Sequence, residues 1–222
     1  MKIILSFVIA GVLVVTGVSL SVAQEGNTIK SVADSAMKPA VSAPDSKAMA
    51  QEMGMSEEMM EKMQKFSTPG EEHKVLEQLV GQWETNAKFW MGPDTEPKVS
   101  KGRAVTKLIH GGRFIEQTYD STFMDQPYQG RWFTGFDNQK KQYVSVWIDN
   151  MNTGLTTSTS TYDPATKTFT EEGSYSCPLE GGPVKYRGVL KILDDKTYVY
   201  EHHMMDKEGK EFKGMEIIYT RD

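Results

Sequence analysis

The chain has 222 residues and a formal net charge of −5. A mildly acidic chain has no basic excess with which to neutralise phosphates, so we expect no nucleic-acid partner. Cys177 is the sole cysteine, which excludes an intramolecular disulfide and leaves stability to a packed core.

Residues 1–23 have the layout of a secretory signal peptide. Lys2 provides a positive start, residues 3–17 form an apolar run, and Ser-Val-Ala ends at Ala23. Polar residues interrupt the run, which is therefore shorter than the ~20 residues that span a bilayer. We expect cleavage after Ala23, a periplasmic or secreted mature protein, and no membrane span in that protein.

Residues 24–55 are predicted to be a flexible spacer. The segment has no aromatic residue and is rich in Ala, Ser, Lys, Asp and Met. Such a composition buries too little apolar surface to offset the entropy of ordering the chain.

Two short helices are predicted over residues 56–81, covering one end of the domain that follows. In the first, Ser56 is a plausible N-cap, and Met59, Met63 and Phe66 recur at helical spacing.

The second helix has its own start and stop signals. Thr68 is the predicted N-cap, Pro69 the first helical residue and Glu71 the partner in a capping box, with the end near Gly81. Its predicted buried face consists of Leu76, Leu79 and Val80.

Residues 82–222 are predicted to be an all-β domain. Nine turn signals separate ten candidate strands rich in Val, Ile, Thr, Tyr, Phe and Trp, and no long helix intervenes to form parallel crossovers. We therefore expect an antiparallel meander of about ten strands. It could pack as two sheets, but closure into a barrel removes the exposed edges and is favoured.

Several spaced motifs carry a family resemblance: GGRF, GFDN, WIDN, TYDPATKTF and a final MEIIYTR. From Met59 to Arg221 the chain resembles an uncharacterised bacterial family, designated domain of unknown function 1579. The resemblance implies an exported protein with a lipocalin-like or nitrobindin-like barrel and no agreed activity.

The nitrobindin pattern is matched only in part. Gly81 and Trp83 agree with the first half of the Gly-x-Trp-x-Gly-x-Gly opening, but Thr85 and Ala87 replace the later glycines. We therefore transfer no haem ligand to this chain, and expect no cofactor.

Metal binding is not predicted. His202 and His203 are adjacent on a strand and point to opposite faces, so the two cannot easily hold one ion. His73 shares a helix face with Leu76 and is predicted to be a hydrogen-bonded core or interface histidine, and His110 is predicted to be a turn residue. The Met-rich segment from Met49 to Met63 could bind Cu(I), but it contains no His or Cys to tighten such a site.

No catalytic residue is predicted either. The chain has no Gly-x-Ser-x-Gly elbow, and Cys177 lies beside no obvious base. The paired acids Glu171 and Glu172 are interpreted as solvated. Asp149 follows Trp147 on one strand face, where closing the turn at residues 150–154 is its predicted role.

The strongest pattern is aromatic, and inward aromatic residues with a few polar groups fit either a small-molecule pocket or a filled core. Ten strands exceed the roughly eight whose interior side chains readily fill, which favours a cavity. The pattern leaves open which face of strand 142–149 points inward. The candidate ligand-binding residues are Trp83, Trp132, Trp147, Tyr200, His202 and Arg221.

Arg221 follows Tyr219 near the end of the last strand, and the two are hypothesised to bind a carboxylate. The alternative is that Arg221 pairs with an acid to fasten that strand.

The predicted function is binding of a small apolar or amphipathic molecule inside an exported barrel. The alternatives are an enzyme that uses His202 or Asp149 as a general base, or a filled structural or interaction barrel of the cell envelope. The sequence leaves the oligomeric state open.

Overall fold

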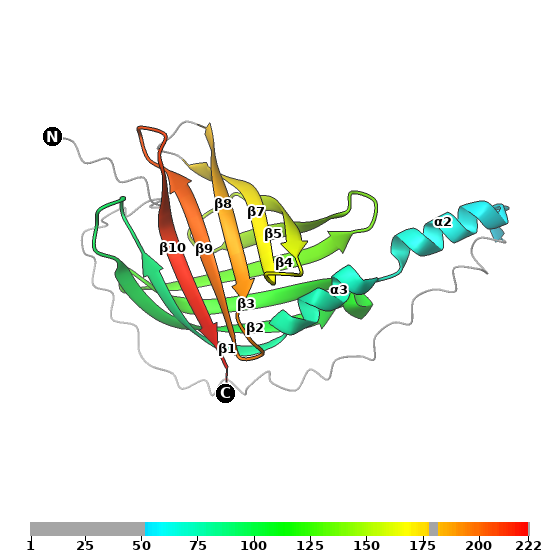
Figure 1. The fold of residues 1–222 in the computed structure, drawn as a ribbon, viewed down its shortest axis with the longest axis horizontal. Helices are drawn as coiled ribbons and strands as arrows, with labels where there is room; N and C mark the ends of the chain where they lie inside the picture. Colours follow the sequence, from blue (N-terminus) through cyan, green and yellow to red (C-terminus); the bar gives the residue numbers. More distant parts are fainter. Residues whose placement is uncertain (1–51, 178–181, 222) are drawn as a thin grey trace, which may run out of the picture.

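The barrel is closed and has ten strands. The computed structural model describes residues 52–177 and 182–221. Within them every strand pairs antiparallel with its neighbour in sequence, and β1 pairs with β10 to complete the ring (Figure 1). The predicted all-β meander and its closure are confirmed. The predicted signal peptide and residues 24–51 of the predicted spacer lie outside the described residues.

The ten observed strands lie in the β-rich segments between the predicted turns. They are β1 (Gly81–Phe89), β2 (Lys98–Ile109), β3 (Phe114–Phe123), β4 (Gln126–Asp137), β5 (Gln142–Asp149), β6 (Thr156–Asp163), β7 (Thr168–Cys177), β8 (Gly182–Ile192), β9 (Thr197–Met205) and β10 (Glu211–Thr220).

The first helix, α2 (Glu57–Ser67), extends away from the barrel (Figure 1). Its predicted N-cap is confirmed, because the Ser56 hydroxyl accepts a hydrogen bond from the Met59 amide at 3.3 Å. No residue of α2 is buried. The helix is tied to the barrel at its end, where the Asn138 side chain donates to the carbonyl of Phe66. We expected this helix to cover one end of the barrel, and it does not.

The second helix begins later than predicted. α3 (Glu71–Val75) has Gly70 as its N-cap, and the Gly70 amide donates to Nδ1 of His73 at 3.0 Å. The capping box predicted for Thr68 and Glu71 is wrong, because the Thr68 hydroxyl instead donates to a carbonyl in the last turn of α2. The chain then continues as the 3₁₀ helix η1 (Leu76–Leu79) directly into β1.

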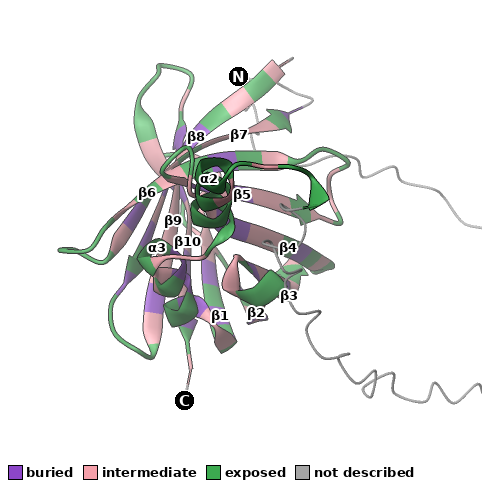
Figure 2. Cartoon of the chain, turned by 90° about the vertical axis from the view of Figure 1, so that its right-hand side faces the viewer, coloured by how far each residue is buried: buried purple, intermediate pink, exposed green. Residues whose placement is uncertain are grey.

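α3 and η1 lie over one end of the barrel (Figure 2). Leu76 and Leu79 are each 1% exposed and belong to the core, and burial of a Leu side chain contributes about 1.5 to 3 kcal/mol. The Tyr143 hydroxyl donates to the Glu72 carbonyl at 2.8 Å. The buried His73 ring contacts the Phe136 ring edge-on, so its predicted place in the core is confirmed. We call this the covered end.

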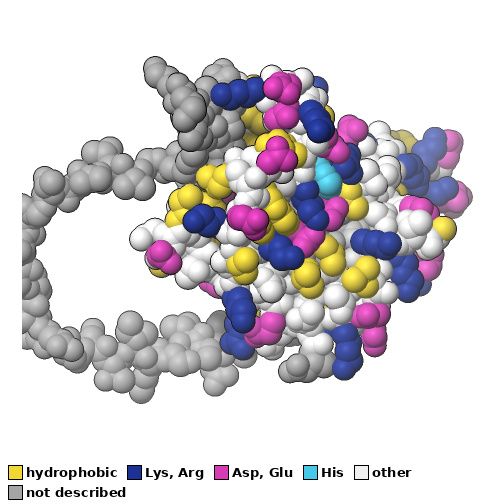
Figure 3. Space-filling view, turned by 60° about the vertical axis from the view of Figure 1, so that its left-hand side comes forward, with side chains coloured by type: hydrophobic (Ala, Val, Ile, Leu, Met, Phe, Trp, Pro, Cys, Tyr) yellow, Lys and Arg dark blue, Asp and Glu magenta, His cyan; other side chains and the backbone are white. Residues whose placement is uncertain are grey.

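The outer surface of the barrel carries charges of both signs among scattered apolar side chains (Figure 3). On β8, β9 and β10, Lys213 pairs with Glu201 at 3.0 Å and Arg187 with Glu211 at 2.7 Å. His203 joins this group on the outside, 3.2 Å from Glu201, whereas His202 lines the interior. The alternation predicted for the two histidines is confirmed. In the described part, no helix is long and apolar enough to span a membrane.

Candidate ligand-binding cavity

The barrel encloses a cavity of about 220 Å³. Its walls include the ends of β1 and β3, the start of β6 and the loop after β5, so it lies toward the end opposite α3. An engineered cavity of about 150 Å³ in another protein holds benzene. The space in this barrel is therefore large enough for a small aromatic molecule.

The inward face of β5, which the sequence left open, carries Tyr143, Ser145 and Trp147. Tyr143 and Ser145 are buried, and Trp147 lines the cavity. Trp132 on β4 is the register partner of Trp147. The Trp147 indole lies over Gly130, where a Cβ atom would stand 2.1 Å from the ring. The glycine therefore makes room for the indole at the cavity wall.

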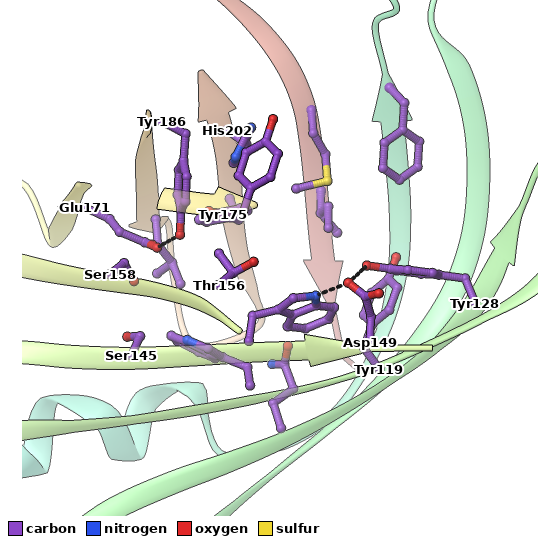
Figure 4. Close-up of a pocket in the computed structure, with 18 of the residues that line it drawn as sticks. Tyr119, Tyr128, Ser145, Asp149, Thr156, Ser158, Glu171, Tyr175, Tyr186 and His202 are labelled. Atoms are coloured by element: carbon purple, nitrogen blue, oxygen red, sulfur yellow. Dashed lines mark hydrogen bonds between the residues drawn. The ribbon is translucent and has the colours of Figure 1, made fainter. Parts of the chain in front are cut away.

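Asp149 holds the aromatic wall in place (Figure 4). One carboxylate oxygen accepts from the Trp147 indole N–H at 2.9 Å and from the Tyr128 hydroxyl at 3.4 Å. The other accepts from the backbone amides of Met151 and Asn152 at 2.8 and 2.9 Å. The predicted turn-closing role of Asp149 is confirmed. Its contacts with the two rings were not predicted.

Glu171 forms a second polar cluster from β7 (Figure 4). The Tyr186 hydroxyl donates to its carboxylate at 2.6 Å. Burial raises the pKa of the Glu171 carboxyl, and hydrogen bonds from Tyr186 and Ser158 partly oppose this rise. The interpretation of Glu171 as a solvated acid is wrong, whereas its neighbour Glu172 is indeed exposed.

Two glycines create the space for this second cluster. A Cβ atom on Gly188 would lie 2.9 Å from the Glu171 carboxylate, and one on Gly173 would lie 2.4 Å from the Tyr186 ring. Both glycines stand on neighbouring strands that carry the cluster. Larger residues at these positions would displace the two polar side chains.

His202 completes the polar side of the cavity. Its ring stacks on Tyr186 with centroids 4.4 Å apart and planes at 28°. Burial lowers the pKa of His202 to about 4, with a smaller contribution from His203, so the imidazole is neutral at neutral pH. A neutral imidazole offers one donor and one acceptor to a ligand.

Four of the six predicted site residues line the cavity: Trp132, Trp147, Tyr200 and His202. The other two, Trp83 and Arg221, lie at the covered end. Trp83 is buried, and its indole N–H donates to the Leu79 carbonyl at 3.0 Å.

Arg221 packs on Trp83, with the guanidinium carbon 4.2 Å from the ring centroid. It also donates to the carbonyls of Val80 and Asp195, each at 2.7 Å. Arg221 is not among the residues that line the cavity, so the geometry does not support the predicted binding of a ligand carboxylate there. The alternative was correct in that Arg221 fastens the last strand, although its partners are carbonyls and not an acid.

The polar side chains that line the cavity are either carboxylic acids or uncharged groups. Asp149 and Glu171 are its two carboxyl groups, and the residues described around the cavity include no Lys or Arg. Across residues 52–177 and 182–221, no three His, Cys, Asp or Glu side chains are grouped so that they could hold a metal ion.

A closed barrel with one end covered by a helix and an aromatic cavity toward the other defines a small antiparallel β-barrel protein. The profile of a family described as "Protein of unknown function (DUF1579)" matches residues 68–221. The chain belongs to this family, as the spaced motifs implied.

Several solved structures match the chain. Rv2717c from M. tuberculosis superimposes with a TM-score of 0.53 and 13% identity, covering 70% of this chain and 99% of that one. A redesigned β-barrel gives a TM-score of 0.34 with 14% identity over 70% of this chain and 99% of that one. Another redesigned β-barrel, mFAP0, bound to DFHBI, gives a TM-score of 0.33 with 15% identity, covering 65% of this chain and 99% of that one. No curated protein matches the chain.

Proposed function

We propose that this protein binds a small apolar or amphipathic molecule in the barrel cavity, and that it does so in the periplasm or outside the cell. The observation that carries the proposal is the cavity of about 220 Å³ with an aromatic wall and inward polar groups. Pockets for small molecules combine these two features.

The cost of the cavity supports binding over a purely structural role. Space left inside a barrel lowers its stability, because the side chains that line it lose van der Waals contacts. Gly130 and Gly173 stand where larger residues would change the lining. A barrel that served only as a scaffold would gain stability by filling this space.

The geometry favours binding over catalysis as well. His202, the predicted general base, has its pKa lowered to about 4, and a base is most effective when its pKa lies near the working pH. Both oxygens of Asp149, the other predicted base, already accept hydrogen bonds from the protein. Neither group is poised to remove a proton at neutral pH.

Calorimetric titration with an uncharged aromatic probe, naphthalen-2-ylmethanol, tests the proposal. Thr156 lines the cavity on β6, whereas Thr157 is exposed on the outer face of the same strand. We expect saturable binding at one site in the wild type, at least a tenfold loss in Thr156→Phe, and no change in Thr157→Phe. Absence of binding to the wild type, or equal binding to both variants, would overturn the proposal.

A further inference from the structure

We propose that the ligand is an organic cation, a protonated amine on an apolar body, whose ammonium group lies beside Glu171 and whose body lies against the aromatic wall. This inference rests on the proposed function and names the class of molecule that the cavity takes.

The first argument is the charge of the lining. Asp149 and Glu171 both face the cavity, and no cation of the described residues faces them there. None of the ion pairs found in the described part of the chain includes either acid, although Lys213 and Arg187 pair with acids on the outer surface. A negative site enclosed by apolar walls attracts cations and repels anions.

The second argument is the aromatic surface. Tryptophan and tyrosine rings attract a cation to their faces, and the attraction grows when water is excluded. The rings that contribute to the cavity from β4, β5, β7, β8 and β9 are Tyr128, Trp132, Trp147, Tyr175, Tyr186 and Tyr200. The same surface packs against the apolar body of an amine.

The third argument separates the two acids. Asp149 accepts hydrogen bonds from two rings and two backbone amides, so its oxygens are occupied. For Glu171 the partners are the hydroxyls of Tyr186 and Ser158. His202, stacked on Tyr186, adds a neutral ring nitrogen that can accept from an ammonium group. Glu171 is therefore the acid that a cation would meet.

The titration of Glu171 provides a readout. The titratable groups that face it are Tyr186 from β8 and Tyr200 and His202 from β9. Burial raises the pKa of both tyrosines and lowers that of His202, so all three are neutral at neutral pH. Burial also raises the pKa of Glu171. Because a bound cation stabilises the ionised carboxylate, its binding should release a proton wherever Glu171 is still protonated.

The experiment compares three probes with one naphthalene body: naphthalen-2-ylmethylammonium, naphthalen-2-ylmethanol and naphthalene-2-carboxylate. We expect the ammonium probe to bind at least tenfold more tightly than the alcohol, and the carboxylate to bind most weakly. In Glu171→Gln the ammonium probe should fall to the affinity of the alcohol, whose own affinity stays unchanged. Glu172→Gln, on the opposite face of β7, should behave as the wild type.

Measurements on the wild type keep the test decisive if Glu171→Gln does not fold. The affinity for the ammonium probe should rise with pH as Glu171 ionises, while that for the alcohol stays constant. Equal affinity for ammonium and alcohol, or tighter binding of the carboxylate, would overturn the cation assignment and leave the proposed function standing. If none of the three probes bound, the proposed function would fail with it.

Discussion

The indole of Trp147 occupies the space directly over Gly130. A Cβ atom on residue 130 would lie 2.1 Å from the ring, far inside contact distance. The two residues lie on adjacent strands, β5 and β4, and the indole N–H reaches Asp149 at 2.9 Å. The position of this ring, and with it one wall of the cavity, therefore depends on the absence of a side chain at residue 130.

Gly130→Ala is expected to displace Trp147 and to lower the free energy of unfolding by about 1 to 3 kcal/mol, the usual cost of overpacking. Affinity for naphthalen-2-ylmethanol should fall with it. Chemical denaturation and calorimetry measure the two effects. Gly154→Ala is the control, because a Cβ atom there meets only Ser176 at 3.8 Å. Wild-type stability in Gly130→Ala would show that the ring does not need this space.

Arg221→Ala tests the covered end separately from the cavity. The substitution removes two hydrogen bonds to carbonyls and the contact with the Trp83 ring. We expect the free energy of unfolding to fall by about 1 to 3 kcal/mol and probe affinity to stay unchanged. Arg103→Ala removes only an exposed pair with Glu84 and should cost less than about 1 kcal/mol. A selective loss of affinity for a carboxylate probe in Arg221→Ala would return this residue to the binding site.

His202 should make the protein less stable as the pH falls. Its folded-state pKa of about 4 lies below the ordinary 6.5, so the neutral ring contributes stability above pH 6.5 that is lost as the pH falls toward 4. Between pH 7 and 4.5, the wild type should lose about 2 kcal/mol more than His202→Gln in urea unfolding. Glu171, whose pKa is raised, acts in the opposite direction, but it does so in both proteins. Parallel pH profiles for wild type and variant would contradict this account.

The compartment is tested by the mass of the chain. When the gene is expressed in an exporting bacterial host, we expect a mature protein that begins at Gln24, because the Ser-Val-Ala sequence ends at Ala23. Intact-mass spectrometry of the envelope and secreted fractions measures this directly. If the chain recovered from these fractions still began with Met1, the proposed exported location would be wrong.

The fold could be predicted from the sequence because turn signals and β-rich segments alternate throughout residues 82–222. The direction in which β5 faces could not. Val144 and Val146 on one face look as suitable for a core as Tyr143 and Trp147 on the other. In the closed barrel the face with the larger aromatic side chains points inward, and the two valines lie half buried on the outer face.

Only part of the site could be predicted from the sequence. Glu171 shares its strand face with the buried Phe169 and with Tyr175, and this alternation could have identified it as inward. Arg221 follows the last residue of β10, so the alternation of the strand no longer fixes its direction. Trp83 points inward as a buried core residue, but it is the third residue of β1, shortly after η1, and therefore belongs to the covered end.

The most direct test of the cavity as the binding site is methyl NMR of the protein labelled with methyl-¹³C methionine. Met151, Met204 and Met215 line the cavity, whereas Met124 and Met205 are exposed. On addition of naphthalen-2-ylmethanol, we expect the first three methyl signals to shift and saturate together while the other two stay still. A shift confined to Met59 and Met63, on the exposed face of α2, would place the probe outside the barrel and contradict the account.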